Sequence, residues 1–291
     1  MNSKTTNHRN IRILALTINL LTLIPLTPVF ADPQDSSAST LPFELFDGHI
    51  ILAQLPMVGA QDSLSVMIDT GASHSVINRK AAKRIKAARL GGAAVKAGAF
   101  DGASEMERVI VRGLRFAGRT LTIACYSAEL PWDNVDLMLG LDVLRSQSFR
   151  IDYEARQITF APQSGLAKEM PFTFEEGLLL VDVQIGQETY RLSIDSGAPL
   201  TSLRKDRCGA SVKSLKGTRA ALRRLGGTSD VQTVNLPEMQ IGGSRLDSVT
   251  ALILGGGGET ESVRDGVIGP KSLGFKAVQF DFAHNRMGFE F

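Results

Sequence analysis

Two short motifs in the sequence place a carboxylate directly before a hydroxyl and a glycine. They are Asp-Thr-Gly at residues 69–71 and Asp-Ser-Gly at residues 195–197. Two carboxylates held a few Å apart cannot both ionise, so they share a proton. One can then take a proton from water while its protonated partner donates to a carbonyl oxygen. Such a pair would hydrolyse an amide without a metal ion or a nucleophilic side chain.

The two motifs belong to an internal duplication. Each follows an apolar segment, in residues 64–77 (LSVMIDTGASHSVI) and 190–203 (YRLSIDSGAPLTSL). The two aspartates lie 126 residues apart, and the glycines of two later apolar-apolar-Gly motifs, Gly140 and Gly269, lie 129 apart. Several landmarks therefore recur in one order at nearly one spacing, which indicates two copies of one domain.

One Asp-Thr-Gly triplet alone has a simpler interpretation. It would be a turn at the end of a strand, where glycine supplies a positive φ and aspartate caps the backbone. A turn does not explain why the motif occurs twice, each time behind an apolar strand and before a matched apolar-apolar-Gly element. The pairing therefore favours a functional pair of carboxylates.

The surrounding elements are predicted to be mainly strands. From residue 41 onward, short apolar and β-branched segments alternate with Gly-rich turns, and strands are expected at 109–111, 121–124 and 178–185. One helix is predicted over residues 78–90 (NRKAAKRIKAARL), because it ends at two glycines. A turn-rich β protein is the expected class.

These motifs resemble those of the aspartic peptidases, in the form of two retropepsin-like domains in tandem. Residues 69–71 resemble the first active-site loop of that family and residues 195–197 the second. The segments 138–140 and 267–269 resemble the element that lies beneath each loop. The resemblance covers about residues 41–291 and implies a mostly β fold, with two lobes related by a pseudo-twofold axis and a cleft between them.

The resemblance also implies roles for individual residues. Asp69 and Asp195 would be the catalytic pair, and their proton cannot be assigned to either one because such a pair titrates as a unit. The residue after each aspartate would hydrogen-bond across the lobes, and the following glycine would let backbone N–H groups approach the carboxylates. These supporting residues are Thr70, Gly71, Ser196 and Gly197.

The family covers its cleft with a β-hairpin flap. The matching stretch of the first repeat is residues 97–108, in which Asp101 and Gly102 form a turn signal and Phe100 is a candidate substrate contact. Residues 225–231 offer a second flap, which would favour the two-flap arrangement of retropepsins. An ordinary surface hairpin explains that second stretch equally well.

The N-terminus predicts export. Residues 1–31 combine three basic residues, an apolar run and Val29-Phe30-Ala31 at the end, as a secretory signal peptide does. An uncleaved membrane anchor is the alternative, but Pro25 and Pro28 disfavour a spanning helix. Residues 32–40 are expected to be a polar linker, 41–163 the first domain and 164–291 the second. The mature protein is expected to be periplasmic or secreted, without stable membrane insertion.

Composition excludes several other classes of protein. The chain has 32 Lys+Arg against 30 Asp+Glu and 43% hydrophobic residues, which argues against a disordered chain, a polytopic membrane protein and a nucleic-acid partner. Its histidines and two cysteines are not spaced as metal ligands, so neither a metal nor a cofactor is expected. Cys125 and Cys208 are expected to remain unpaired.

Together these features predict an exported aspartic endopeptidase with a peptide or protein substrate. Both half-sites lie on one chain, so a monomer with an intramolecular pseudo-dimer is expected. A non-catalytic peptide- or protein-binding module on the same scaffold is the alternative, and pairing with a second copy is a third interpretation. Pro199 departs from Ser73 of the first repeat and leaves the geometry of the second loop open.

The residue after each triplet predicts the pH dependence. Pepsin-like enzymes commonly have a Ser or Thr there, which hydrogen-bonds the ionised carboxylate and lowers its pKa. This sequence has Ala72 and Ala198 instead. The pair should therefore keep its shared proton to higher pH, and the activity optimum should be less acidic than that of pepsin.

Overall fold

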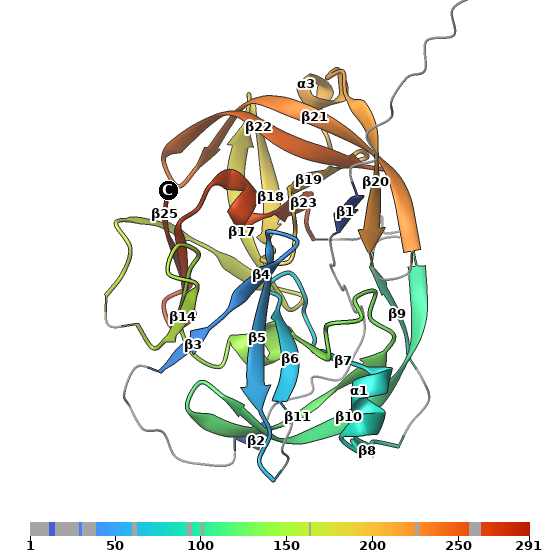
Figure 1. Ribbon diagram of the computed structural model, residues 1–291. Coiled ribbons are helices and arrows are strands. Elements are labelled where there is room, and N and C mark those ends of the chain that lie inside the picture. The colour runs from blue at the N-terminus through green and yellow to red at the C-terminus, as the bar shows by residue number, and fades with distance from the viewer. Residues whose placement is uncertain are drawn as a thin grey trace, which may run out of the picture.

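The computed structural model of the chain describes residues 12–14, 29–30, 39–59, 63–91, 95–99, 102–162, 164–224, 227–255 and 263–291. Strands dominate these residues and form two similar lobes, one around each Asp motif (Figure 1). The prediction of a mostly β fold with two lobes is confirmed.

A ten-stranded sheet builds the first lobe. Its order is β4 (Glu44–Phe46), β5 (Ile50–Pro56), β6 (Ser63–Ile68), β12 (Leu137–Leu139), β7 (Val76–Asn78), β11 (Arg119–Ala128), β10 (Gly102–Phe116) and β8 (Ala88–Arg89). Off this path, β2 (Val29–Phe30) pairs with β11 and β9 (Val95–Ala99) pairs with β10.

A nine-stranded sheet builds the second lobe. Its order is β16 (Thr173–Glu175), β17 (Leu178–Ile185), β18 (Glu188–Ile194), β23 (Gly266–Ile268), β19 (Thr201–Arg204), β22 (Ser244–Leu254), β21 (Gly227–Ile241), β20 (Thr218–Arg224) and β1 (Arg12–Leu14). The path β17-β18-β23-β19-β22-β21 repeats β5-β6-β12-β7-β11-β10 strand for strand. The duplication read from the sequence is therefore also a duplication of topology.

A third sheet joins the two repeats. It has six strands in the order β15 (Lys168–Pro171), β25 (Arg286–Glu290), β24 (Ala277–Asp281), β13 (Phe149–Asp152), β14 (Gln157–Phe160) and β3 (Thr40–Pro42). The central pair, β13 and β24, comes from matching segments of the two repeats and is antiparallel, with Phe149 opposite Phe280. Their rings lie 5.1 Å apart between centroids, so the repeats share part of one apolar core.

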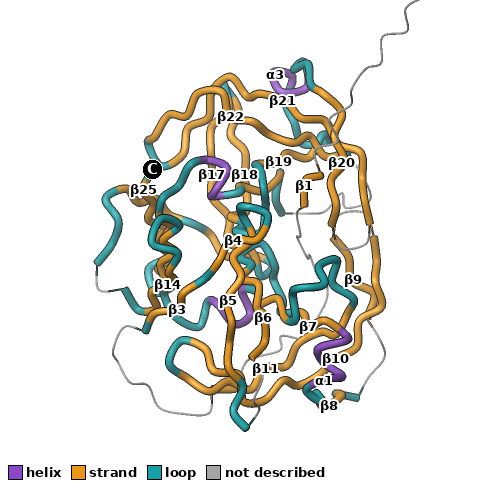
Figure 2. The backbone as a smooth tube through the Cα atoms, viewed as in Figure 1, coloured by secondary structure: helices purple, strands orange, loops and turns teal. Residues whose placement is uncertain are grey.

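Helices are short and lie between strands (Figure 2). They are α1 (Arg79–Arg84), α2 (Leu141–Leu144), α3 (Ala210–Lys213) and the 3₁₀ turn η1 (Pro270–Leu273). The prediction of one helix over 78–90 is wrong in its second half. Asn78 caps α1, but Lys86 has a φ of 53°, which an α-helix does not allow, and the chain then forms β8 against β10.

Two short strands lie within the segment predicted to be a signal peptide. β1 pairs in parallel with β20, and β2 pairs in antiparallel with β11. Cleavage after Ala31 would remove both strands, and the prediction of a signal peptide stays a prediction. Among the described residues, no helix is long and apolar enough to cross a membrane.

Candidate active site

Each aspartate stands at the end of a central strand, beside its apolar-apolar-Gly element. The Asp69 N–H donates to the Leu139 carbonyl at 3.0 Å, and the Asp195 N–H donates to the Ile268 carbonyl at 2.9 Å. These bonds continue the parallel pairings β6–β12 and β18–β23 beyond the strand ends. The same local sequence therefore places both aspartates in the same backbone setting.

The glycine after each element is required by close packing. A Cβ atom on Gly140 would lie 2.8 Å from the Ala72 carbonyl oxygen, and one on Gly269 would lie 2.5 Å from that of Ala198. Real Cβ atoms do not approach backbone this closely, so only glycine lets the element pass beneath the loop.

Hydroxyl groups connect the two loops across the lobes. Thr70 Oγ1 donates to the Ile194 carbonyl at 2.9 Å and accepts the Ser196 N–H at 3.0 Å. Ser196 Oγ donates to the Ile68 carbonyl at 2.8 Å and accepts the Thr70 N–H at 3.1 Å. All of these groups are buried, so the four bonds fix the separation of the two aspartates in a site shielded from water.

The two carboxyl groups face each other. The Gly71 N–H donates to Asp69 Oδ1 and the Gly197 N–H to Asp195 Oδ1, both at 2.9 Å. A Cβ atom on Gly71 would overlap the Asp195 carboxyl, and one on Gly197 would lie 3.5 Å from the Asp69 carboxyl carbon. Gly71 therefore leaves room for the carboxylate of the other lobe, whereas a Cβ atom on Gly197 would make only an ordinary contact with Asp69.

Burial raises the pKa of Asp69 well above its usual range, and the charge of Asp195 raises it further. The N–H groups of Gly71 and Ala72 stabilise the ionised form and act in the opposite direction. The net effect is that the site holds a proton at pH values where an exposed aspartate has lost it. This is the electrostatic property expected of a carboxylate pair that shares one proton.

Family comparisons agree with this geometry. Residues 57–146 match the model of the family described as gag-polyprotein putative aspartyl protease, and residues 181–270 match the aspartyl protease family. Each match contains one Asp loop together with its apolar-apolar-Gly element. The chain carries two aspartyl protease domains in tandem. The resemblance seen in the sequence is confirmed.

Two further comparisons add little to this assignment. Comparison with curated proteins gives no match. Among solved structures, the chain is similar to basic 7S globulin from soybean, with 14% identity and a TM-score of 0.48, over 91% of this chain and 96% of that one. This similarity is too distant to bear on function.

Both aspartyl protease domains form a hairpin at the position predicted for a flap. In the first, β9 pairs with β10 up to Ala99 opposite Gly102. In the second, β20 pairs with β21 up to Arg224 opposite Gly227. The ends of the two hairpins approach each other in the view of Figure 1. Phe100 and Asp101 lie outside the described residues, so their substrate contact stays a prediction.

The structure places one further polar residue, Asp142, against Ser75 at the end of the first Asp loop, and sequence reasoning missed this pair. Asp142 accepts hydrogen bonds from the Ser75 N–H at 2.9 Å and from Ser75 Oγ at 2.7 Å. Asp142 follows Gly140 by two residues, where the second domain has Lys271. A position-by-position comparison of the repeats would have marked this difference.

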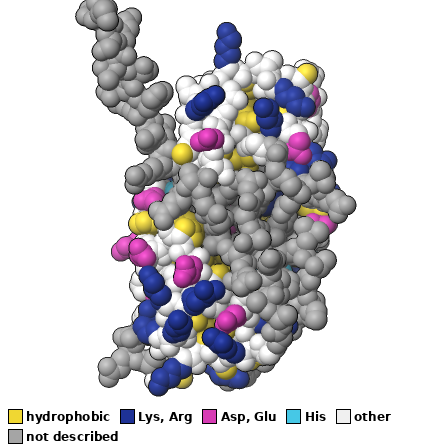
Figure 3. Space-filling view, turned by 90° about the vertical axis from the view of Figure 1, so that its right-hand side faces the viewer, with side chains coloured by type: hydrophobic (Ala, Val, Ile, Leu, Met, Phe, Trp, Pro, Cys, Tyr) yellow, Lys and Arg dark blue, Asp and Glu magenta, His cyan; other side chains and the backbone are white. Residues whose placement is uncertain are grey.

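Other candidate sites are weaker. Cys125 and Cys208 are both free and buried, as expected. Over the described part of the chain, no group of three or more His, Cys, Asp or Glu side chains is placed to hold a metal ion. On the face in Figure 3, basic and acidic side chains are interspersed among the described residues.

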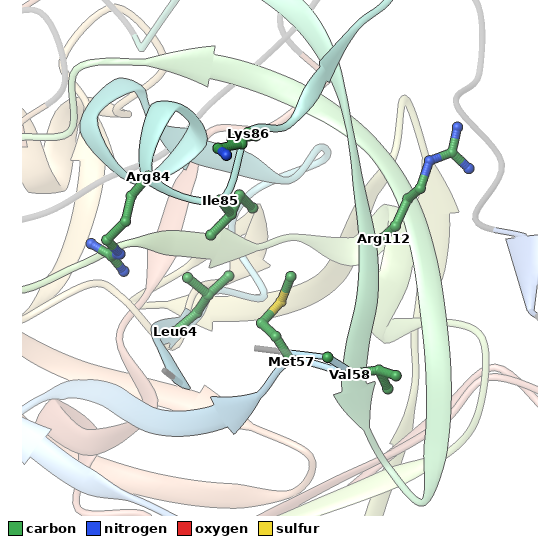
Figure 4. A pocket seen from close by; sticks show the side chains of 8 residues that line it. Met57, Val58, Leu64, Arg84, Ile85, Lys86 and Arg112 are labelled. Carbon is green, nitrogen blue, oxygen red and sulfur yellow. The ribbon is translucent and has the colours of Figure 1, made fainter. Parts of the chain in front are cut away.

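A cavity of about 320 Å³ lies in the first domain, away from both Asp loops (Figure 4). Apolar side chains and three cations line it, but Arg84 and Arg112 point away from each other. The cations therefore do not converge on one point. The lining residues are Met57, Val58, Gly59, Leu64, Arg84, Ile85, Lys86 and Arg112.

Proposed function

We propose that this protein is an exported aspartic endopeptidase, in which Asp69 and Asp195 activate water to hydrolyse peptide bonds. One observation carries the proposal: the hydroxyls of Thr70 and Ser196 tie the two Asp loops together, so that two buried carboxyl groups of one chain face each other. A module that only binds peptides would have no chemical need for this pair, because burying carboxylates side by side disfavours their ionisation.

The pair begins the reaction with one proton. The ionised carboxylate takes a proton from water as the water oxygen attacks the peptide carbonyl carbon, and the protonated carboxyl donates to the carbonyl oxygen. The product of this step is a tetrahedral diol.

The second step returns the pair to its starting state. The carboxyl that took the water proton donates it to the amide nitrogen, and the C–N bond breaks. The other carboxylate takes a proton from one diol hydroxyl, which leaves a carboxylic acid product and an amine. One proton again remains on the pair, and neither aspartate has a fixed role because the pair titrates as a unit.

The location of the protein is a further part of the proposal. Basic residues, an apolar run and a small-residue end within residues 1–31 support removal of a signal peptide and a periplasmic or secreted mature protein. Both Asp loops belong to one chain, which supports a monomeric enzyme. The substrate is a peptide or an unfolded protein segment.

Cleavage in isotopically labelled water tests the reaction. The full chain is expressed with its own N-terminal segment, purified and incubated with an unfolded protein in H₂¹⁸O, and the products are identified by mass spectrometry. We expect new amino termini and one ¹⁸O in each new carboxyl group, because one oxygen of that group comes from water. Binding of peptides without any new termini would support the binding-module alternative and overturn the proposal.

Sequencing the purified protein's own N-terminus tests removal of residues 1–31.

A further inference from the structure

The loop that carries Asp69 (residues 69–75, the first loop) is anchored at its far end by Ser75. The Ser75 N–H and Oγ both donate to Asp142, and Ser75 Oγ accepts the Gly140 N–H at 3.1 Å. A further bond runs from the Leu141 N–H to the Ala72 carbonyl at 2.8 Å. Helix α2 and the residue before it therefore hold both the middle and the end of the first loop.

The corresponding loop around Asp195 (residues 195–201, the second loop) lacks these bonds. Thr201 occupies the position of Ser75, and its buried Oγ1 has no hydrogen-bond partner among the described residues. Pro270 occupies the position of Leu141 and has no N–H to donate to the Ala198 carbonyl. Lys271, exposed and basic, stands in place of Asp142.

We propose that Asp142 is a positioning residue of the active site, which acts through Ser75 to fix the first loop while the second loop adjusts to the substrate. The inference rests on the proposed peptidase function. The two lobes would then have different roles, although both hold their aspartate in the same backbone setting. Asp142 does not touch the carboxyl pair directly, so its effect passes through the backbone between Ala72 and Ser75.

The anchor depends on the negative charge of Asp142. An ionised carboxylate can accept all three available donors, namely the N–H and Oγ of Ser75 and the Val143 N–H at 3.0 Å. A protonated carboxyl or an amide has its own hydrogens, so either one of these donors loses its acceptor or the Ser75 hydroxyl must turn to accept instead. Burial raises the pKa of Asp142 to about 6, so acidification toward pH 6 weakens the anchor.

Few other titrating groups face Asp142. Burial raises the pKa of Cys125 and of Tyr126, both in β11, and the charge of Asp142 lies near enough to raise both further. Both groups stay neutral near pH 6. Burial lowers the pKa of His74 in the first loop, and the charge of Arg145, which follows α2, lowers it further. His74 therefore titrates below its ordinary range, and Asp142→Asn separates the two titrations.

The test combines one measurement that needs no activity with one that does. In the full-length protein, the ¹⁵N–¹H resonance of the Ser75 amide is followed from pH 4.5 to 8 (about the range set by the Asp142 pKa). We expect a titration with a midpoint near pH 6 that disappears in Asp142→Asn. If the Ser75 resonance titrates unchanged in Asp142→Asn, or does not titrate in the wild type, Asp142 does not anchor the first loop through Ser75.

The second measurement is kcat/KM against pH on a peptide that the wild type cleaves. Asp142→Asn and Ser75→Ala should each lower kcat/KM about tenfold near neutral pH, since small displacements of catalytic groups slow reactions strongly. Asp142→Asn should also lose the component of the acidic limb near pH 6. Thr201→Val is the matched control in the second loop and should stay within about twofold of the wild type, because its hydroxyl makes no bond to lose.

The outcomes separate this inference from the proposed function. Cleavage by the wild type with equal losses in Ser75→Ala and Thr201→Val, or an unchanged pH profile in Asp142→Asn, overturns the positioning role but leaves the peptidase intact. A Ser75 titration without any cleavage overturns the peptidase function and with it the catalytic role of Asp142. Should Asp142→Asn fail to fold, Ser75→Ala decides the test, because it removes the hydroxyl link and leaves the carboxylate.

Discussion

The two lobes are alike in the loops that carry the aspartates. They differ in the residues that pack against those loops. The first loop lies against an apolar cluster that includes Met67, Val76 and Val135. At the matching positions the second lobe has the buried polar residues Ser193, Ser202 and Arg264. The Arg264 guanidinium donates a hydrogen bond of 3.0 Å to the Ser193 hydroxyl.

The difference shows which features the chemistry constrains. Both copies retain the aspartate, the hydroxyl, the glycine and the apolar-apolar-Gly element, because each of these positions one carboxyl against the other. The residues that pack against the two loops do not contact the carboxyl pair, so they need not match between the lobes. The first lobe uses Asp142 and an apolar cluster there, and the second uses polar residues. The two lobes therefore serve as matched controls for each other when the same kind of residue is changed in each.

The largest effect is expected at the aspartates, and it should be equal in the two lobes. Asp69→Asn and Asp195→Asn should each lower kcat by about 10³-fold or more, because each removes one half of a proton transfer that works as a unit. Both variants keep the side-chain size, and their unfolding curves serve as the control for folding. Near-normal turnover in either variant would mean that one aspartate suffices.

Alanine at the two glycines should separate the lobes. In Gly71→Ala the new methyl overlaps the Asp195 carboxyl, whereas in Gly197→Ala it meets the flexible end of Met67 at 2.6 Å. Displacing a catalytic group can cost about 10²-fold in rate, so Gly71→Ala should lose about that much kcat/KM and Gly197→Ala clearly less. Equal losses in the two variants would contradict the geometry described here.

Stability should report the bonds between the lobes. Thr70→Val and Ser196→Ala each leave a buried N–H and a buried carbonyl without a partner, so each should lower the free energy of unfolding by about 1–3 kcal/mol. Urea unfolding measures the change. Thr201→Val removes a buried hydroxyl that has no partner and should be nearly neutral. If Thr201→Val lowers the free energy of unfolding as much as Thr70→Val, the bonds between the lobes do not account for the loss in Thr70→Val.

The smallest effect is a shift of the pH profile. A hydroxyl at position 72 that donates to the ionised Asp69 stabilises the charged form and lowers a pKa that burial and Asp195 have raised. Ala72→Ser should therefore move the acidic limb of kcat/KM to lower pH by about one unit or less. The wild type should work best well above strongly acidic pH. An acidic limb that stays in place in Ala72→Ser would contradict this cause.

Local patterns predicted the parts of the fold that depend on nearby residues. The strand expected at 178–185 is β17, residue for residue, and both Asp loops follow strands as expected. The helix over 78–90 was overextended, because the two glycines that mark its end do not show that residues 88–89 pair with a strand about twenty residues away. Asp142 was missed because its partner Ser75 is 67 residues distant and only the fold brings them together.

If one chain carries a complete pair of catalytic aspartates, two inactive variants cannot restore each other when mixed. Asp69→Asn and Asp195→Asn are purified separately, unfolded together, refolded as an equimolar mixture and assayed for peptide cleavage beside the wild type. We expect the mixture to stay as inactive as its components, because every chain lacks one member of its own pair. Recovery of about a tenth or more of the wild-type rate would show instead that the pair forms between chains.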